Sequence, residues 1–595
     1  MKTRIEERLS ALREEMKKND TAAYVIPTAD PHMSEYPAAC WKYREWISGF
    51  TGSAGTVVVT ADKAGLWTDS RYFLQAEMQL EGTGIDLFRL KMPDTPSIGE
   101  FLLDELDPHA QVGVDGETMS QTEVENLSHV LGRGRIYLRT DINLLDALWT
   151  DRPAIPDAPI FEMPVEFSGK STEDKLTDIH LALHKAGADC TVLSALDEVA
   201  WTCNIRGTDV AYNPVAIAYL FVSNNENVLF IHPKKVPEEM ARQLQKEGVI
   251  LADYTKLYDY LKKLPDKTRI LLDPNHTNAA IFGHLPEKVK WIEGTSPANK
   301  LKAIKNETEL NGFHAAVVRD GVALTKFYYW LETSLQAGET ITELDASRKL
   351  SALRSEQPYY LMDSFESISA YAAHGAIVHY AATPETNATL KPEGLYLLDS
   401  GAQYMDGTTD ITRTIALGEP TEQMRKDFTR VLKGTISLAK SKFPAGTRGS
   451  QLDILARKAL WDAGLNFLHG TGHGIGHCLN VHEGPQSIRM EENPTVLEPG
   501  MVTSDEPGLY RAGEYGIRTE NMIVTREDSE TEFGRFLHME TLTLCYIDTR
   551  LIIVSMLSAR EHAWLNKYHQ EVYEKLAPSL SDDEREWLRM KTREI

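Results

Sequence analysis

The chain has 595 residues, of which 42% are hydrophobic and 25% are charged, and its formal net charge is −24 at pH 7. This composition is typical of a globular protein, and the length indicates about three to five domains. The negative charge argues against binding to nucleic acid or to an anionic membrane, and no apolar run reaches the roughly 18–20 residues that span a bilayer. The five cysteines are odd in number and have no CxxC spacing, so we expect reduced thiols in a cytoplasmic protein.

Residues 1–160 predict an α/β domain. The pattern of residues 5–18 is that of a charged amphipathic helix, and no apolar segment typical of a secretory signal accompanies it. Alternating and β-branched residues then predict three strands. The expected strands are 22–27, 55–60 and 64–68.

Residues 161–302 repeat the plan of the first domain. A helix is expected at 173–186 and a strand at 189–196. The motif YVIPTAD aligns with TVLSALD, and VGVD ending at Asp115 aligns with ILLD ending at Asp273. We therefore expect two similar α/β domains in succession.

A third domain is expected at 303–550. Asn306 and Glu309 form the pattern of an N-cap and capping pair, which predicts a helix over 307–334. Residues 551–595 form a tail with helical signals, above all over 558–576.

The stretch LLDSGAQYMDGTTDITRT, residues 397–414, predicts a β-hairpin with an Asp-Gly turn at 406–407. In that register both Asp399 and Asp410 lie on one face, but roughly 13 Å apart at about 3.3 Å per residue. This separation is too large for one compact metal site. The register must therefore be shifted or the strand bulged, and Gly401 could accommodate a bulge.

Three later segments carry the same kind of ligand chemistry. His473 lies in HGTGHGIG, Glu506 in DEPG and Glu520 in GIRTEN. Together with the two aspartates they provide four carboxylates and one imidazole, a set that suits divalent Mn, Co or Zn. Four carboxylates balance the charge of two divalent ions, whereas without metal they would repel one another and take up protons. Two such ions can share a hydroxide and polarise a carbonyl.

This ligand order resembles that of the pita-bread metallopeptidases, which include methionine aminopeptidase, prolidase and aminopeptidase P. DSGAQYMDGTTDITRT, HGTGHGIG, LNVHEGP, FTGSAGT and WTDSRYFLQAE are most similar to the long, three-domain cytosolic aminopeptidase P family. The resemblance covers nearly the whole chain. It implies an α/β fold class: two similar creatinase-like domains, then a pita-bread catalytic domain, then a helical extension.

The resemblance also implies a dinuclear metal site, with Mn²⁺ expected and Zn²⁺ or Co²⁺ as alternatives. The implied ligands are Asp399, Asp410, His473, Glu506 and Glu520. Asp399 would chelate one ion, Asp410 and Glu520 would bridge, and His473 and Glu506 would hold the other.

Further residues match the family's active-site pattern. Glu506 would also shuttle the proton, and His379 and His482 would bind and stabilise the intermediate. His469 would line the proline side. Arg518, two residues before Glu520, is expected to orient a ligand carboxylate or its neighbour and to belong to the substrate-binding residues with His379, His469 and His482. His374 and His477 match no fixed histidine of the family, so neither is assigned to the site.

The implied reaction is hydrolysis of the N-terminal Xaa-Pro bond of peptides by a metal-bridging hydroxide. The implied partners are peptides with proline in second position, and a second copy of the chain in a homodimer. A prolidase-type Xaa-Pro dipeptidase shares the ligands but typically has one N-terminal domain. A catalytically inactive scaffold typically lacks metal ligands, and all five are present here.

Overall fold

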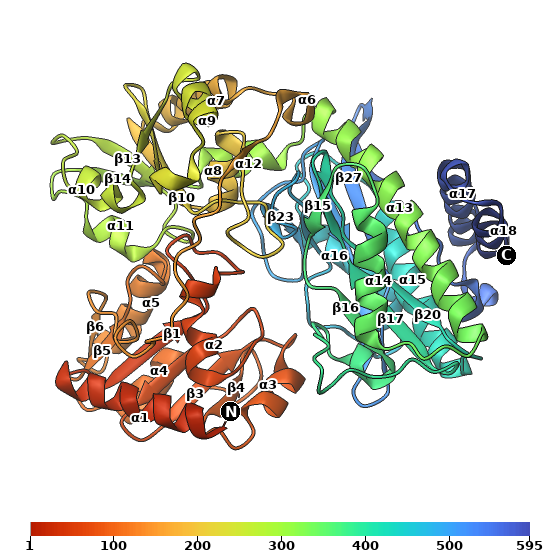
Figure 1. Cartoon of the computed structure of the whole chain (residues 1–595), viewed down its shortest axis with the longest axis horizontal. Coiled ribbons are helices and arrows are strands. Elements are labelled where there is room, and N and C mark those ends of the chain that lie inside the picture. The colour runs from red at the N-terminus through yellow and green to blue at the C-terminus, as the bar shows by residue number, and fades with distance from the viewer. Residues whose placement is uncertain (1) are drawn as a thin grey trace. The chain divides into compact units, whose positions relative to one another are not determined.

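The computed structural model describes residues 2–595, which fold into two compact units (Figure 1). The first unit contains residues up to 162 together with 170–298, and the second contains 163–169 together with 299–595. In Figure 1 the first unit runs from red to yellow and the second is mainly green to blue. Each unit has its own sheets and its own hydrophobic core.

The first unit contains two six-stranded mixed sheets of identical topology and a short antiparallel pair, β7 (Phe161–Glu162) with β9 (Ile205–Arg206). The strand orders of the six-stranded sheets are β4-β3-β2-β1-β5-β6 and β12-β11-β10-β8-β13-β14. In both, the third strand pairs antiparallel with each neighbour, and every other pair is parallel. The strands of the first sheet are β1 (Ala23–Pro27), β2 (Thr56–Thr60), β3 (Ala64–Thr68), β4 (Asp86–Arg89), β5 (Gln111–Val114) and β6 (Tyr137–Arg139). The strands of the second are β8 (Cys190–Leu193), β10 (Ala218–Ser223), β11 (Asn227–Ile231), β12 (Val249–Ala252), β13 (Arg269–Leu272) and β14 (Lys290–Glu293).

The matching topologies confirm that the two N-terminal α/β parts are similar. YVIPTAD supplies β1 and TVLSALD supplies β8, while VGVD and ILLD supply β5 and β13. The expected strand over 189–196 is shorter in the structure, because Leu196 already begins helix α8. The helices of this unit are α1 (Lys2–Lys18), α2 (Tyr43–Ser48), α3 (Phe73–Leu80), α4 (Ile98–Glu105), α5 (Gln121–Gly132), α7 (Thr172–Ala186), α8 (Leu196–Thr202), α9 (Glu238–Lys246), α10 (Leu257–Leu261) and α11 (Ala279–Gly283).

Long helices pack against the sheets of the second unit and bury a shared core (Figure 1). The predicted helix over 307–334 is α13, and Asn306 with Glu309 forms its capping box, as expected. The predicted tail helix is α17, capped by Ser558. The helices of this unit are α6 (Val165–Ser168), α13 (Glu307–Gln336), α14 (Glu343–Ser355), α15 (Glu422–Ala439), α16 (Gly449–Trp461), α17 (Ala559–Leu576) and α18 (Asp582–Lys591). Helix α12 (Pro297–Ala303) spans the boundary between the units.

The sheets of the second unit bring together segments that are far apart in sequence. Their orders are β16-β17-β20, β15-β18-β19, β25-β26 and β21-β28-β27-β24-β22-β23. The strands are β15 (Tyr360–Asp363), β16 (Ile368–Tyr371), β17 (Leu395–Ser400), β18 (Ala402–Tyr404), β19 (Gly407–Thr408), β20 (Ile411–Ala416), β21 (Lys442–Pro444), β22 (Gly472–Gly474), β23 (Glu483–Ile488), β24 (Val502–Asp505), β25 (Gly508–Arg511), β26 (Tyr515–Arg518), β27 (Asn521–Thr531) and β28 (Gly534–Thr541).

The hairpin is present, but its predicted register is wrong by two residues. Tyr404 pairs with Gly407, so the two-residue turn is Met405-Asp406. Asp399 therefore lies opposite Thr412. Since Asp410 is two positions from Thr412 on the same face, the two aspartates are separated along the ladder by roughly 7 Å instead of 13 Å. The shifted register, one of the two alternatives left open by the sequence, brings them within reach of one site.

Candidate metal centre

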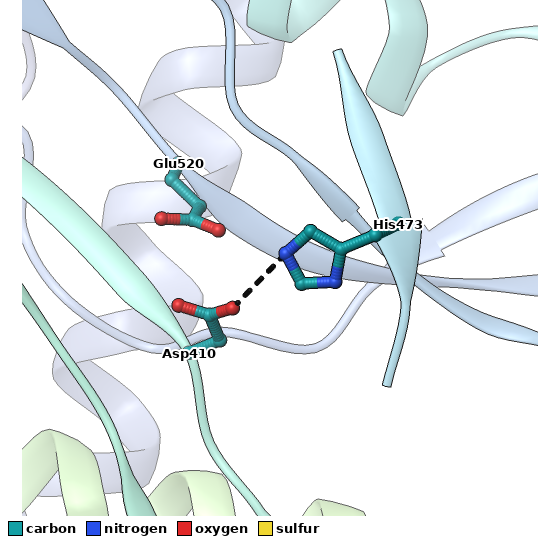
Figure 2. A group of neighbouring side chains, drawn as sticks. All are labelled: Asp410, His473 and Glu520. Atoms are coloured by element: carbon teal, nitrogen blue, oxygen red, sulfur yellow. Dashed lines mark ion pairs between the residues drawn. The ribbon is translucent and has the colours of Figure 1, made fainter. Parts of the chain in front are cut away.

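Three of the predicted ligands form a tight cluster. Asp410, His473 and Glu520 each offer a ligand atom, and these atoms lie within 4.8 Å of one another. Figure 2 shows the two carboxylates facing the imidazole, with Nε2 of His473 3.5 Å from Oδ2 of Asp410. Asp410 and Glu520 are buried. A divalent ion placed among such atoms would gain both charge balance and ligands.

The other two predicted ligands lie beside this cluster. Oε1 of Glu506 is 3.4 Å from Nε2 of His473. Asp399 is buried; its Oδ2 accepts a hydrogen bond from Nη2 of Arg518 at 2.6 Å, while its Oδ1 has no hydrogen-bond partner among the described residues. A buried carboxylate oxygen without a donor is costly, and a metal ion would remove that cost.

Backbone contacts orient His473 for metal binding. Its Nδ1 lies 2.9 Å from the carbonyl oxygen of Gly474 and must donate to it, which leaves the lone pair of Nε2 directed at the carboxylates. The Ser504 hydroxyl accepts from the His473 amide at 2.9 Å and donates to Glu506 at 3.1 Å. The glycines around His473 keep the segment extended in β22, as their low helix propensity predicted.

Without metal ions, the carboxyl groups of the cluster lack enough positive charge nearby to stabilise their ionised forms. Burial raises the pKa of Asp410 well above its usual range, and the nearby carboxylates of Asp399 and Glu506 raise it further. Burial and the same neighbours, with Asp410, raise the pKa of Glu520 in the same way. Burial raises the pKa of Glu506 to about 7, although Arg518 opposes the shift. Cations would let these groups ionise, so the donor set fits two divalent metal ions.

Arg518 connects Asp399 to a further hydrogen-bond network. Its Nη1 donates to the Tyr510 hydroxyl at 2.7 Å, and that hydroxyl lies 2.8 Å from Nε2 of His469. Nδ1 of His469 lies 2.7 Å from the carbonyl oxygen of Gly470. Both ring nitrogens of His469 are thus engaged in the protein, with Tyr510 as the donor to Nε2. Tyr510 had no sequence signal, because its role depends on spatial contact with Arg518.

Residues around Glu520 hold it from two sides. The Thr412 hydroxyl donates to Oε2 of Glu520 at 2.7 Å and accepts from Nε of Arg518 at 3.1 Å. Nη1 of Arg413 donates to the backbone carbonyl of Glu520 at 2.6 Å. The hairpin strand β20 therefore contributes two neighbours that fix Glu520, which lies between β26 and β27.

His482 packs against His473 of the candidate metal centre. The rings of His473 and His482 meet edge to face with centroids 4.3 Å apart. The residue after His482 is Glu483, whose buried carboxylate forms ion pairs with Lys305 and, at 3.0 Å, with Lys302. These ion pairs anchor Glu483, the residue next to His482, in the interior of the protein.

The fold and this site define a metallopeptidase. Residues 311–527 match the family described as "Metallopeptidase family M24", and residues 535–595 match its C-terminal region. Residues 8–140 and 151–309 each match a "Creatinase/Prolidase N-terminal domain". These matches confirm the expected fold class of two creatinase-like domains followed by a pita-bread domain.

The chain belongs to the Xaa-Pro aminopeptidase P family. It is 42% identical to the "Probable Xaa-Pro aminopeptidase P" of Coprinopsis cinerea, over 99% of this chain and 98% of that protein. It is 40% identical to "Aminopeptidase P2" of Arabidopsis thaliana, over 99% of this chain and 89% of that protein. The crystal structure of the X-prolyl aminopeptidase of Caenorhabditis elegans, described as a cytosolic enzyme with a di-nuclear active site, covers 99% of both chains with a TM-score of 0.94 and 36% identity.

The alternative, an Xaa-Pro dipeptidase, resembles only part of the chain. The Xaa-Pro dipeptidase of Bacillus anthracis covers 63% of this chain and 98% of its own, with a TM-score of 0.50 and 24% identity. That likeness extends to the fold alone. Within residues 2–595, the helices are all too short or too polar to cross a bilayer.

Proposed function

We propose that this enzyme removes the N-terminal residue from peptides that have proline in second position. The observation that carries the proposal is the convergence of Asp399, Asp410, His473, Glu506 and Glu520 in a chain that matches aminopeptidase P relatives along its length. Two bound divalent ions, which we propose to be Mn²⁺, would supply an acidified water as nucleophile and polarise the scissile carbonyl.

The protein's own groups then handle protons and charge. Glu506 accepts a proton from the attacking water and returns it to the leaving proline nitrogen, a task suited to a carboxylate that lies 3.4 Å from His473 and accepts a hydrogen bond from the Ser504 hydroxyl. Arg518 holds Asp399 in place. His379 and His482 donate hydrogen bonds to the oxygen that becomes negative, and His469 lines the proline side.

Proline selectivity follows from the missing hydrogen-bond donor. The Xaa-Pro bond is a tertiary amide, so its nitrogen brings no N–H into the pocket. Any other second residue brings an N–H that needs a partner, at a cost of about 1–3 kcal/mol when none is present. We propose in addition that the enzyme is cytoplasmic and forms homodimers, as the family resemblance implies.

The test compares four peptides with the metal-reconstituted enzyme. We expect kcat/KM for Xaa-Pro-Yaa to exceed that for Xaa-Ala-Yaa by about 5- to 150-fold. N-acetylation of the proline peptide should block cleavage, because an exopeptidase must read the free amine. Equal rates on the alanine and proline tripeptides would reject the proposal. Cleavage of the Xaa-Pro dipeptide but not of Xaa-Pro-Yaa would favour a dipeptidase.

A further inference from the structure

Glu343, the first residue of α14, gathers a long segment of chain around its carboxylate. The side chain is buried, with 0% of it exposed. Its four hydrogen-bond donors all come from residues 371–388. On Oε1 these are the Tyr371 amide at 2.7 Å and Nδ1 of His374 at 2.8 Å; on Oε2 they are the Tyr380 hydroxyl and the Ala388 amide, both at 2.9 Å. Hydrogen bonds to a carboxylate are stronger than those between neutral groups, so these four fix the segment firmly.

The same segment is also tied to the metal centre. The carbonyl oxygen of Val378 accepts from Nη2 of Arg518 at 3.4 Å, and that same nitrogen donates to Asp399 at 2.6 Å. The backbones of Gly375 and Gly516 lie in close contact. A Cβ atom added to Gly516 would lie only 1.7 Å from the carbonyl oxygen of Gly375. One side of the segment therefore rests on β26, next to Arg518.

His379 lies between these two anchors. It follows Val378, which is bound by Arg518, and precedes Tyr380, which is bound by Glu343. His374 and Tyr380, which both donate to Glu343, lie on either side of His379 in the sequence. Their rings stack on each other with centroids 4.5 Å apart. Hydrogen bonds therefore hold the segment on both sides of His379.

We propose that Glu343 is a positioning residue that fixes residues 371–388 and so orients His379 for the substrate carbonyl. The inference rests on the role proposed above for His379. A loop that is ordered before substrate arrives has no ordering entropy to lose in the reaction. A misplacement of about 1 Å at a reacting group can reduce the rate about 100-fold.

The first test replaces Glu343 with glutamine and follows the loop without substrate. Glutamine keeps the shape but turns an NH₂ group toward one pair of donors. We expect faster amide hydrogen exchange in residues 376–388, with the bound metal content unchanged. Tyr371→Phe is the matched control: it keeps the amide that binds Glu343 and removes only the hydroxyl contact with the Glu393 carbonyl, 3.0 Å long. Exchange in Glu343→Gln that equals that of the wild type would overturn the proposal.

The second test asks whether Glu343 acts through His379. In the wild-type background, Glu343→Gln should lower kcat/KM for Xaa-Pro-Yaa by about 10- to 100-fold. In a His379→Ala background it should lower kcat/KM less than about twofold, because residues that act as a unit are not additive. An equal fall in both backgrounds would indicate a merely structural role and refute the proposal.

Two further variants keep the tests decisive if Glu343→Gln does not fold. Tyr380→Phe and His374→Ala each remove one donor to Glu343, and we expect the same changes in exchange and the same coupling to His379. A wild-type enzyme that cleaves no Xaa-Pro peptide would refute the proposed function. The exchange measurement would still decide whether Glu343 holds the loop, so the two failures are distinguishable.

Discussion

At the scale of single residues, Glu506 is suited to proton transfer. It lies within 3.4 Å of His473 and accepts from the Ser504 hydroxyl. Burial raises its pKa to about 7 in the metal-free protein, and a bound cation would lower that pKa again, which would leave the carboxylate free to accept a proton at neutral pH. The pKa values of Asp410 and Glu520 are raised well above the usual range, and these groups depend on cations for their charge.

Replacing Glu506 with glutamine should lower kcat far more than it lowers stability. The change keeps the side-chain shape but removes the proposed general base, and loss of such a base alone is worth about 10²–10⁴-fold in rate. Steady-state kinetics, metal content and thermal unfolding measured together would separate catalysis from folding. Glu514→Gln, the same change on an exposed turn, should leave kcat unchanged. A Glu506→Gln enzyme with near-normal kcat and two bound metals would contradict the assigned role.

Metal removal should make stability fall with increasing pH. In the metal-free protein, Asp410, Glu506 and Glu520 retain protons that an unfolded chain releases above about pH 4–4.5. The folded state then binds more protons than the unfolded state, so its stability decreases as pH rises from about 4 towards 7 and beyond. Calorimetry with and without chelator should show this decrease only in the chelated protein. A pH-independent Tm of chelated protein would contradict it.

At the scale of elements, the hairpin shows what sequence can and cannot specify. Strand alternation correctly placed Asp399 and Asp410 on one face. It could not choose between a turn at Met405-Asp406 and one at Asp406-Gly407, which differ by two residues in register. The difference arises from tertiary contacts: Arg354 donates to the Gly401 carbonyl at 3.2 Å, and its partner Asp320 accepts from the Tyr404 hydroxyl at 3.0 Å.

The role of Glu343 was beyond sequence reasoning for a related reason. Its donors lie 28 to 45 residues further along the chain, and two of the four are backbone amides. No residue pattern marks a backbone donor. His374, left outside the site because the family does not fix a histidine there, contacts Glu343 directly.

Gly401→Ala should disrupt the hairpin and the metal centre together. A Cβ at this position would lie 1.9 Å from the Thr409 carbonyl oxygen and 2.2 Å from Oγ of Ser364. Backbone must move to relieve the first contact, and overpacking of this kind typically costs about 1–3 kcal/mol. We expect a lower Tm and fewer bound metal ions. Gly132→Ala is the control, because a Cβ there meets nothing within 4 Å. Normal metal content in Gly401→Ala would show that the close approach is not needed.

At the scale of the whole molecule, the repeated sheets and the C-terminal extension differ in how well sequence predicts them. The repeat was detectable because YVIPTAD and TVLSALD occupy equivalent strands. The tail was predicted to be helical, but its sequence does not reveal what it contacts. In the structure, α17 reaches the centre of the catalytic unit: the Tyr568 hydroxyl is 2.9 Å from Nη2 of Arg413, the arginine that binds the Glu520 carbonyl.

Removing the extension after residue 557 should therefore unfold the catalytic unit. Helix α17 buries four side chains in the core that it shares with strands β17, β20 and β24 beside the candidate metal centre: Leu565, Tyr568, Val572 and Leu576. At about 1.5–3 kcal/mol each, their loss would remove roughly 6–12 kcal/mol, comparable to the whole stability of a typical domain. Truncation would also leave the Ile547 amide without its acceptor, Nε2 of His569 at 3.1 Å.

A milder variant tests the contact itself. Tyr568→Phe keeps the ring but removes the hydroxyl beside Arg413. We expect a loss of about 1–3 kcal/mol in unfolding free energy, because the buried Cys545 amide, which donates to this hydroxyl at 3.3 Å, loses its acceptor. Metal affinity should also weaken, since Arg413 helps to place Glu520. Tyr573→Phe, in the same helix but only half-buried, is the control. Denaturant unfolding measures the loss of stability, and metal titration measures the loss of metal affinity. For the truncation, a shortened chain with wild-type Tm and metal content would show that the extension is dispensable.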